Sequence, residues 1–187
     1  MSRSTPLVDK IIAVHRGLAR AGIAHAFGGA LALAWCTRRP RGTSDIDVNI
    51  FLPMGAARDA FAALPEQVTW TDEDVDRCRR DGQVRVFWGP NPVDVFLNTT
   101  PFHEELVARA QVSSLAGVPL PFLACDDLAV FKAFFDRTKD WADIEEMLDA
   151  GAIDAARVGA VLESYLGEDH RVAMVRALGQ ARGDARS

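Results

Sequence analysis

The chain has 187 residues, of which 49% are hydrophobic and 25% are charged, and its formal net charge is −5 at pH 7. This length and composition are typical of a globular protein with one well-packed core. The acidic balance excludes a general basic footprint for nucleic acid, so an RNA or DNA partner would have to meet a local basic patch. The amino end lacks an apolar signal core and no apolar run reaches membrane-spanning length, which predicts a cytoplasmic protein without a membrane partner.

The first part of the chain alternates helical and strand patterns. Apolar residues at helical spacing from Leu7 to Leu18 predict a first helix, which ends at Gly22. The segments that follow predict a short strand at 25–27, a small-residue helix at 30–36, a polar loop at 37–42, a strand at 45–52 and an amphipathic helix at 54–64.

Further along, strands and hairpins come first and an entirely helical pattern follows from residue 126 onward. A weak strand at 68–70 and a short helix capped by Thr71 precede two alternating segments, which flank Gly89-Pro90-Asn91 and predict a hairpin. The remaining predicted elements are a helix at 102–110, a hairpin within 111–123, and helices at 126–135, 138–148, 154–166 and 171–181. This order predicts an α/β (α+β) fold, with a catalytic core at 1–124 and a C-terminal helical segment at 125–187 packed on it.

The cysteines and histidines match no metal-binding spacing. The three cysteines, Cys36, Cys78 and Cys125, are odd in number and widely separated, which predicts reduced and mostly buried thiols rather than a disulfide framework. The four histidines are predicted to be packing or surface residues; they are His15, His25, His103 and His170.

Two aspartates alternate with apolar residues in the strand predicted at 45–52. Asp45 and Asp47 share one face, because strand side chains repeat every two residues. Their charges repel, which predicts a hard divalent cation, Mg²⁺, between them. Solvent-facing charges on a half-exposed strand remain an alternative for the pair alone. An EF-hand loop is excluded, because its sixth and twelfth positions would be Ile50 and Ala56 instead of Gly and Glu.

A third carboxylate and a glycine pair add to this pattern. Asp94 lies between Val93 and Val95 in an apolar strand, where a buried carboxylate needs a partner or a metal. Three carboxylates on adjacent strands would form a two-metal site for in-line attack at phosphorus. Gly28-Gly29 lies between a predicted strand and a predicted helix, where exposed backbone N–H groups suit phosphate. Its spacing fits neither a P-loop nor a dinucleotide fingerprint.

The combination resembles the DNA polymerase β-type nucleotidyltransferase superfamily, whose pattern is a Gly-Gly or Gly-Ser pair, a short spacer, Asp-x-Asp and a third strand carboxylate. A later segment is similar to the Lys…Arg…Lys/Arg-Asp-x-x-Asp-Ile segment of the minimal, AbiEii-like branch, which contains toxins of bacterial toxin–antitoxin systems. Its residues are Asp127-Leu128-Ala129-Val130-Phe131-Lys132 and Arg137-Thr138-Lys139-Asp140-Trp141-Ala142-Asp143-Ile144. The resemblance spans residues 27–148 and implies a nucleotidyltransferase-fold mixed sheet flanked by helices.

The resemblance also implies roles for individual residues. The metal ligands for Mg²⁺ or Mn²⁺ would be Asp45, Asp47 and Asp94, and Asp94 would also help to deprotonate the acceptor. Residues at the nucleotide would be Gly28, Gly29, Thr43, Ser44 and Lys132, with Lys132 contacting phosphates. Asp140 would be the functional carboxylate of the later segment and Asp143 a structural one. The alternatives are a surface role for Lys132, and ion pairs or caps formed by the two aspartates with Arg137 and Lys139.

Two details of the motif bear on regulation and on phosphate contacts. Gly29 stands where many relatives have serine, so backbone N–H groups would have to replace a hydroxyl. A hydroxyl near Asp-x-Asp is a phosphorylation site in some toxin relatives, which makes Thr43 and Ser44 candidates; a phosphate there would place negative charge beside the carboxylates.

Two arginine groups would serve triphosphate and RNA backbone if they lay at the mouth of the site. They are Arg38, Arg39 and Arg41, and Arg77, Arg79, Arg80 and Arg85. A solvated surface is the alternative for each group, and it is favoured for residues 77–80.

The expected reaction is transfer of a nucleoside monophosphate from a nucleoside triphosphate, such as ATP or CTP, to a hydroxyl. The toxin resemblance implies the 3′ end of tRNA as acceptor and a cognate antitoxin as partner. Two alternatives remain open: a small-molecule, aminoglycoside-like nucleotidyltransferase, and a non-catalytic protein of the same fold that binds a nucleotide or a partner.

Overall fold

The computed structural model describes residues 5–184 and divides into two compact units. The first unit holds the described residues up to Leu31 together with Arg41–Leu123, and the second holds Ala32–Pro40 together with the residues from Ala124 onward. Residues 32–40 fall inside the range predicted for the core, but they group with the C-terminal helices.

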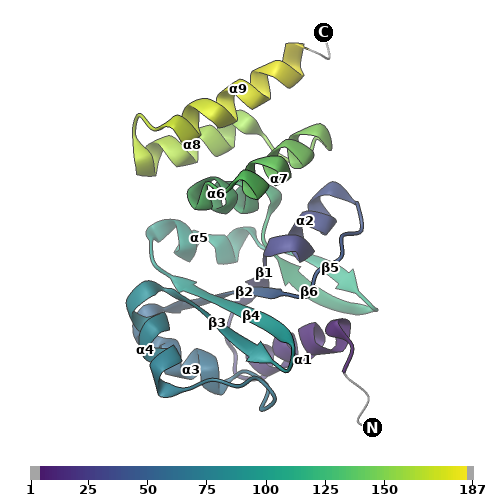
Figure 1. Cartoon of the computed structure of the whole chain (residues 1–187), viewed down its shortest axis with the longest axis vertical. Helices are drawn as coiled ribbons and strands as arrows, with labels where there is room; N and C mark the ends of the chain where they lie inside the picture. The colour runs from purple at the N-terminus through teal and green to yellow at the C-terminus, as the bar shows by residue number, and fades with distance from the viewer. Residues whose placement is uncertain (1–4, 185–187) are drawn as a thin grey trace. The chain divides into compact units, whose positions relative to one another are not determined.

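The first unit is built on a six-stranded mixed sheet in the order β3-β4-β2-β1-β6-β5 (Figure 1). β2 runs parallel to β4 and β1 runs parallel to β6, whereas the other neighbouring strands are antiparallel. This mixed sheet confirms the predicted fold class. The strands are β1 (His25–Phe27), β2 (Ile46–Pro53), β3 (Gln83–Trp88), β4 (Asn91–Asn98), β5 (Gln111–Leu115) and β6 (Val118–Phe122).

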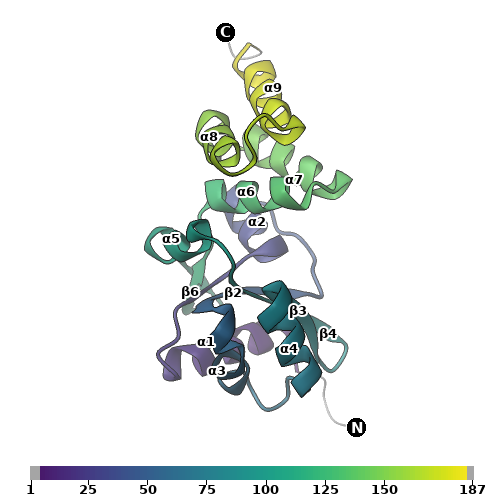
Figure 2. The same cartoon turned by 90° about the vertical axis from the view of Figure 1, so that its left-hand side faces the viewer.

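Helices of the first unit lie on both sides of this sheet. Figures 1 and 2 show α1, α3 and α4 on one side and α5 on the other. Their bounds are α1 (Leu7–Arg20), α3 (Ala57–Ala62), α4 (Asp72–Asp81) and α5 (Pro101–Arg109), and a 3₁₀ turn, η1 (Met54–Ala56), precedes α3. The single helix predicted at 54–64 is therefore wrong in length, because its first turn is 3₁₀ and the α-helix ends at Ala62.

Local sequence signals set the ends of α4. The Thr71 hydroxyl accepts from the Asp74 N–H at 3.3 Å, and the Asp74 carboxylate accepts from the Thr71 N–H at 2.9 Å, which completes a capping box and confirms the predicted cap. Gly82 ends the helix in the left-handed conformation, with φ of 72°. The weak strand predicted just before this helix is reduced to a bridge between Thr69 and Phe87.

The second unit is helical, as predicted. Its helices are α6 (Cys125–Phe135), α7 (Thr138–Asp149), α8 (Ala155–Leu166) and α9 (His170–Asp184), together with the later part of α2 (Gly29–Thr37). Ile144, Val158 and Leu162 are fully buried in its core. Asp154 caps α8 by accepting from the N–H groups of the next helical turn at 2.8 and 3.3 Å. No helix within residues 5–184 combines the length and the apolarity that crossing a membrane requires.

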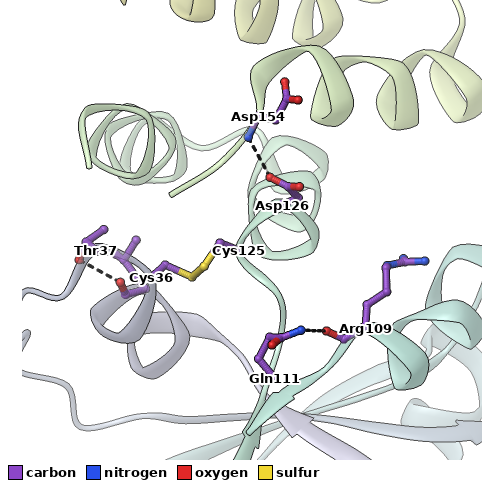
Figure 3. The surroundings of a disulfide bond; sticks show 8 residues. Cys36, Thr37, Arg109, Gln111, Cys125, Asp126 and Asp154 are labelled. Atoms are coloured by element: carbon purple, nitrogen blue, oxygen red, sulfur yellow. Dashed lines mark hydrogen bonds between the residues drawn. A yellow bond between two sulfur atoms is a disulfide. The ribbon is translucent and has the colours of Figure 1, made fainter. Parts of the chain in front are cut away.

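A disulfide lies inside the second unit and corrects the expectation of three reduced cysteines. Cys36 near the end of α2 is bonded to Cys125 at the start of α6, and their Cα atoms are 5.7 Å apart (Figure 3). The two residues are 89 positions apart, so sequence spacing did not reveal that the two helix ends meet. Cys78 is free and buried, as expected. The bond also ties residues 32–40 covalently to the C-terminal helices.

Two of the histidines pack against each other, which confirms their predicted structural role. His15 Nδ1 and His25 Nε2 are 3.0 Å apart, and the His25 ring meets Phe27 edge-on. His25 is 6% exposed, and its burial lowers its pKa below 6.5.

Candidate active site

Asp47 and Asp94 face each other across two parallel strands. In the pairing of β2 with β4, Asp47 is directly opposite Asp94, so their Cα atoms lie on neighbouring strands about 5 Å apart. Ile46, Val48, Val93 and Val95 are fully buried on the opposite face, which fixes both carboxylates on the same face. Asp45 precedes β2 by one residue. The alternation seen in the sequence therefore places Asp47 and Asp94 side by side.

An arginine lies between two of the carboxylates. Arg85 is opposite Asp94 in the antiparallel pairing of β3 with β4. Its Nε donates to Asp94 Oδ1 at 2.8 Å and its Nη2 donates to Asp94 Oδ2 at 2.7 Å, a two-pronged ion pair. The same Nη2 lies 3.5 Å from Asp45 Oδ2. The guanidinium thus bridges Asp94 and Asp45.

The bridge keeps Arg85 charged. Hydrogen bonds to Asp94 are the largest cause that raises the pKa of Arg85 above its usual value, and the charges of Asp94, Asp45 and Asp47 act in the same direction against a partial loss of hydration. The Asp94 side chain is 16% exposed, compared with 36% for Asp45 and 52% for Arg85. Asp94 is therefore the more sheltered of the two bridged carboxylates.

The sequence grouped Arg85 with the arginines of α4, and the structure separates them. Arg77, Arg79 and Arg80 pair with acidic residues of their own helix and form a solvated face, which confirms the interpretation favoured for 77–80. The hairpin turn could have singled out Arg85: pairing Trp88 with Asn91 across Gly89-Pro90 places residue 85 opposite residue 94.

The glycine pair packs against Asp47. The N–H of Gly28 donates to the Asp47 carbonyl at 2.9 Å. Gly29 begins α2 with φ of +53°, and a Cβ at this position would lie 1.9 Å from Asp47 Oδ2. Only a glycine leaves room for the carboxylate here, since serine would bring the same Cβ. The presence of glycine instead of serine at position 29 thus has a steric reason.

Thr43 and Ser44 hold the loop that carries Asp45. The Ser44 hydroxyl donates to Asp45 Oδ1 at 2.6 Å. The Thr43 hydroxyl oxygen accepts from the Asp45 N–H at 3.1 Å. Both hydroxyl groups therefore form a hydrogen bond with Asp45, a candidate metal ligand.

A buried lysine, Lys10, supports the same loop, a role that the sequence did not predict. Lys10 on α1 is 2% exposed, and its Nζ donates to the Trp88 carbonyl at 3.0 Å and to Asn91 Oδ1 at 2.7 Å. Asn91 Nδ2 in turn donates to the Ser44 carbonyl at 2.8 Å. This chain of hydrogen bonds runs from the core to the residue before Asp45. A lysine in an amphipathic helix carries no sequence signal for such a role.

The three aspartates have the ligand chemistry of a divalent-metal site, but their spacing in this structure is not that of one. Within residues 5–184, no three histidine, cysteine, aspartate or glutamate side chains lie close enough together to hold a metal ion. Asp45, Asp47 and Asp94 nevertheless supply the carboxylate oxygens that Mg²⁺ and Mn²⁺ prefer. A cation, the guanidinium of Arg85, already lies between two of them.

Lys132 belongs to a buried ion-pair cluster of the second unit. Its Nζ is 2.6 Å from Asp143 Oδ2 and 3.7 Å from Asp140 Oδ1, and its side chain is 9% exposed. Asp140, which is 1% exposed, also accepts from Arg137 Nε at 2.5 Å. Asp140 and Asp143 therefore neutralise the charges of Lys132 and Arg137. The contact of Lys132 with nucleotide phosphates stays a prediction.

The three arginines of the first group, residues 38, 39 and 41, do not all belong to the same unit. Arg39 lies 4.0 Å from the Glu146 carboxylate and is 69% exposed. Arg38 has a left-handed backbone, with φ of 56°. Arg41 belongs to the first unit, whereas these two belong to the second.

Comparison with known proteins identifies the fold. No protein-family model and no curated protein matches the sequence. The solution structure of the antibiotic-resistance factor ANT(2″)-Ia is similar, with a TM-score of 0.53 and 17% identity over 95% of this chain and 93% of that one. An H. pylori crystal structure, named as a candidate nucleotidyltransferase, matches with a TM-score of 0.41 and 15% identity over 97% and 95% of the two chains. The likeness to ANT(2″)-Ia confirms the predicted mixed-sheet, nucleotidyltransferase-like fold.

Proposed function

We propose that this protein is a metal-dependent nucleotidyltransferase, which transfers a nucleoside monophosphate from a nucleoside triphosphate to a hydroxyl. The observation that carries the proposal is the register of β2 and β4, which sets Asp47 opposite Asp94 on one face. The Gly28-Gly29 turn packed against Asp47 adds backbone N–H groups at the start of α2. The likeness to ANT(2″)-Ia, which extends over 95% of this chain, supports the same conclusion.

In this reaction the acceptor oxygen attacks the α-phosphorus in line with the bond to the leaving pyrophosphate. A new O–P bond forms, the bond between the α-phosphorus and the bridging oxygen breaks, and pyrophosphate leaves with the electron pair. Asp45, Asp47 and Asp94 would hold Mg²⁺ or Mn²⁺, which when bound stabilises negative charge on the triphosphate. Asp94, the more sheltered of the two bridged carboxylates, would accept the proton of the acceptor hydroxyl.

Two acceptor classes have separate support. A small cationic molecule, such as an aminoglycoside, is supported by the likeness to an antibiotic-resistance factor and by the net charge of −5, which favours cations. The 3′ end of tRNA, with a toxin role restrained by an antitoxin, is supported by the segment that contains Lys132 and Asp140. The two classes differ in charge, and an assay that offers both in parallel distinguishes them.

The experiment incubates purified protein with each α-³²P-labelled nucleoside triphosphate and Mg²⁺, in parallel with total tRNA and with a panel of aminoglycosides. We expect label in one acceptor class only, together with released pyrophosphate. Asp47→Asn should abolish transfer, because it removes a metal-binding charge, whereas Asp59→Asn on α3 should not change it. Absence of transfer to every acceptor by folded protein, with nucleotide still bound, would favour the non-catalytic alternative.

A further inference from the structure

We infer that Lys10 and Asn91 are positioning residues for Asp45, the carboxylate that comes just before β2. Lys10 on α1 sets the orientation of the Asn91 side-chain amide at the start of β4, and this amide holds the loop of residues 43–45. The consequence for catalysis rests on the proposed function, whereas the order of the loop can be measured independently of it.

Lys10 is a buried cation whose partners are uncharged. Within residues 5–184, its Nζ donates to the Trp88 carbonyl at 3.0 Å and to Asn91 Oδ1 at 2.7 Å, and it lies 5.6 Å from the centroid of the Trp88 ring, with no carboxylate paired to it. A methionine would fill the same space without the free-energy cost of burying a charge. Packing therefore does not account for a lysine at this position.

The lysine determines which way round the Asn91 amide lies. An ammonium group has three donors and no acceptor, so only the amide oxygen of Asn91 can face it. The amide nitrogen is then turned toward the Ser44 carbonyl, to which Nδ2 donates at 2.8 Å. A reversed amide would bring two donors together at Lys10 and two acceptors together at Ser44. The buried charge thus selects the orientation that binds the loop.

Ser44 passes this restraint to the next residue, Asp45. The Ser44 hydroxyl donates to Asp45 Oδ1 at 2.6 Å, and the Thr43 hydroxyl oxygen accepts from the Asp45 N–H at 3.1 Å. These two bonds lie inside the loop and move with it, whereas the bond from Asn91 joins the loop to the hairpin of β3 and β4. Without that bond, Asp45 would keep its local partners but have a less well-defined position relative to Asp94.

Asn91→Asp separates positioning from stability. The new carboxylate would pair with the Lys10 ammonium, so the unfolding free energy should not fall below that of the wild type. A carboxylate has no donor for the Ser44 carbonyl, so the backbone NMR order parameters of Ser44 and Asp45 should fall from about 0.85 to below about 0.6. Nucleotide transfer should fall by about tenfold, the effect of losing one hydrogen bond.

Two comparison variants complete the experiment. Lys10→Met lets the Asn91 amide reverse, so the order of the loop, the transfer rate and the stability should all fall together. Asn98→Asp adds the same negative charge at the other end of β4 and should change none of the three quantities. Order parameters come from nitrogen-15 relaxation and stability from urea unfolding, and neither measurement depends on turnover.

Each outcome decides the inference. Lower order at Ser44 and Asp45 in Asn91→Asp, with stability retained and slower transfer, supports it. Unchanged order parameters overturn it, and so does wild-type transfer from a loosened loop or a loss of stability equal to that of Lys10→Met. If the wild type transfers nucleotide to no acceptor, the proposed function fails, while the order parameters still decide whether Lys10 and Asn91 fix the loop.

Discussion

A methyl group at Gly29 should disable the site while the fold survives. In Gly29→Ala, the new Cβ would lie 1.9 Å from Asp47 Oδ2. Restoring even a 3.0 Å contact requires the carboxylate to move by about 1 Å, away from its place opposite Asp94. A displacement of that size in a catalytic group costs about 10²-fold in rate.

Stability changes for a separate reason. Gly29 has φ of +53°, a left-handed backbone that costs an alanine about 1–2 kcal/mol. Gly22 has φ of +70°, but a Cβ there would meet nothing within 4 Å. Gly22→Ala therefore has the same backbone cost without the collision, and it is the matched control.

The assay combines urea unfolding with transfer of α-labelled nucleotide to the acceptor class identified above. We expect both variants to lose about 1–2 kcal/mol of unfolding free energy, and only Gly29→Ala to lose activity and Mn²⁺ affinity. If Gly29→Ala retained wild-type activity, the contact between Asp47 and the glycine turn would not matter for the reaction, and the proposed site geometry would be refuted.

Three further predictions concern the scaffold. Lys10→Met should lower the unfolding free energy by about 1–3 kcal/mol, because the buried Trp88 carbonyl and the part-buried Asn91 amide oxygen lose their hydrogen-bond donor; urea unfolding at pH 7.5 tests this. Burial lowers the pKa of His103 to about 4 from 6.5, so its neutral form favours the folded state and its contribution should be lost as pH falls from 6.5 toward 4; a smaller loss in His103→Gln over this window would verify it, and an identical loss would contradict it. Cys36→Ser should lower stability by about 2–4 kcal/mol, because it opens the loop closed with Cys125, whereas Cys78→Ser should keep the bond; alkylation under denaturing, non-reducing conditions should find one free thiol in the wild type and two in Cys36→Ser.

Periodicity predicted the elements because it reports burial along one strand or helix. The alternation around Asp47 and Asp94 gave the right strands and the right face, since each follows from local sequence. The approach of Arg85 to Asp45 could not be derived in the same way, because it depends on which strands become neighbours. Similarly, the Cys36–Cys125 bond joins helix ends that are distant in sequence, and nothing in their surroundings marks them as partners.

The order of the strands has a consequence for how the chain folds. β3 and β4 form a local hairpin, and Arg85 and Asp94 are nine residues apart within it, so their ion pair has low contact order. The pairing of β4 with β2 joins segments more than forty residues apart and closes a much longer loop. We expect the hairpin to dock with Asp94 already neutralised by Arg85, so that Asp47 meets an ion pair instead of a bare carboxylate. The arginine would then assist folding, because it lowers the electrostatic barrier to pairing β4 with β2.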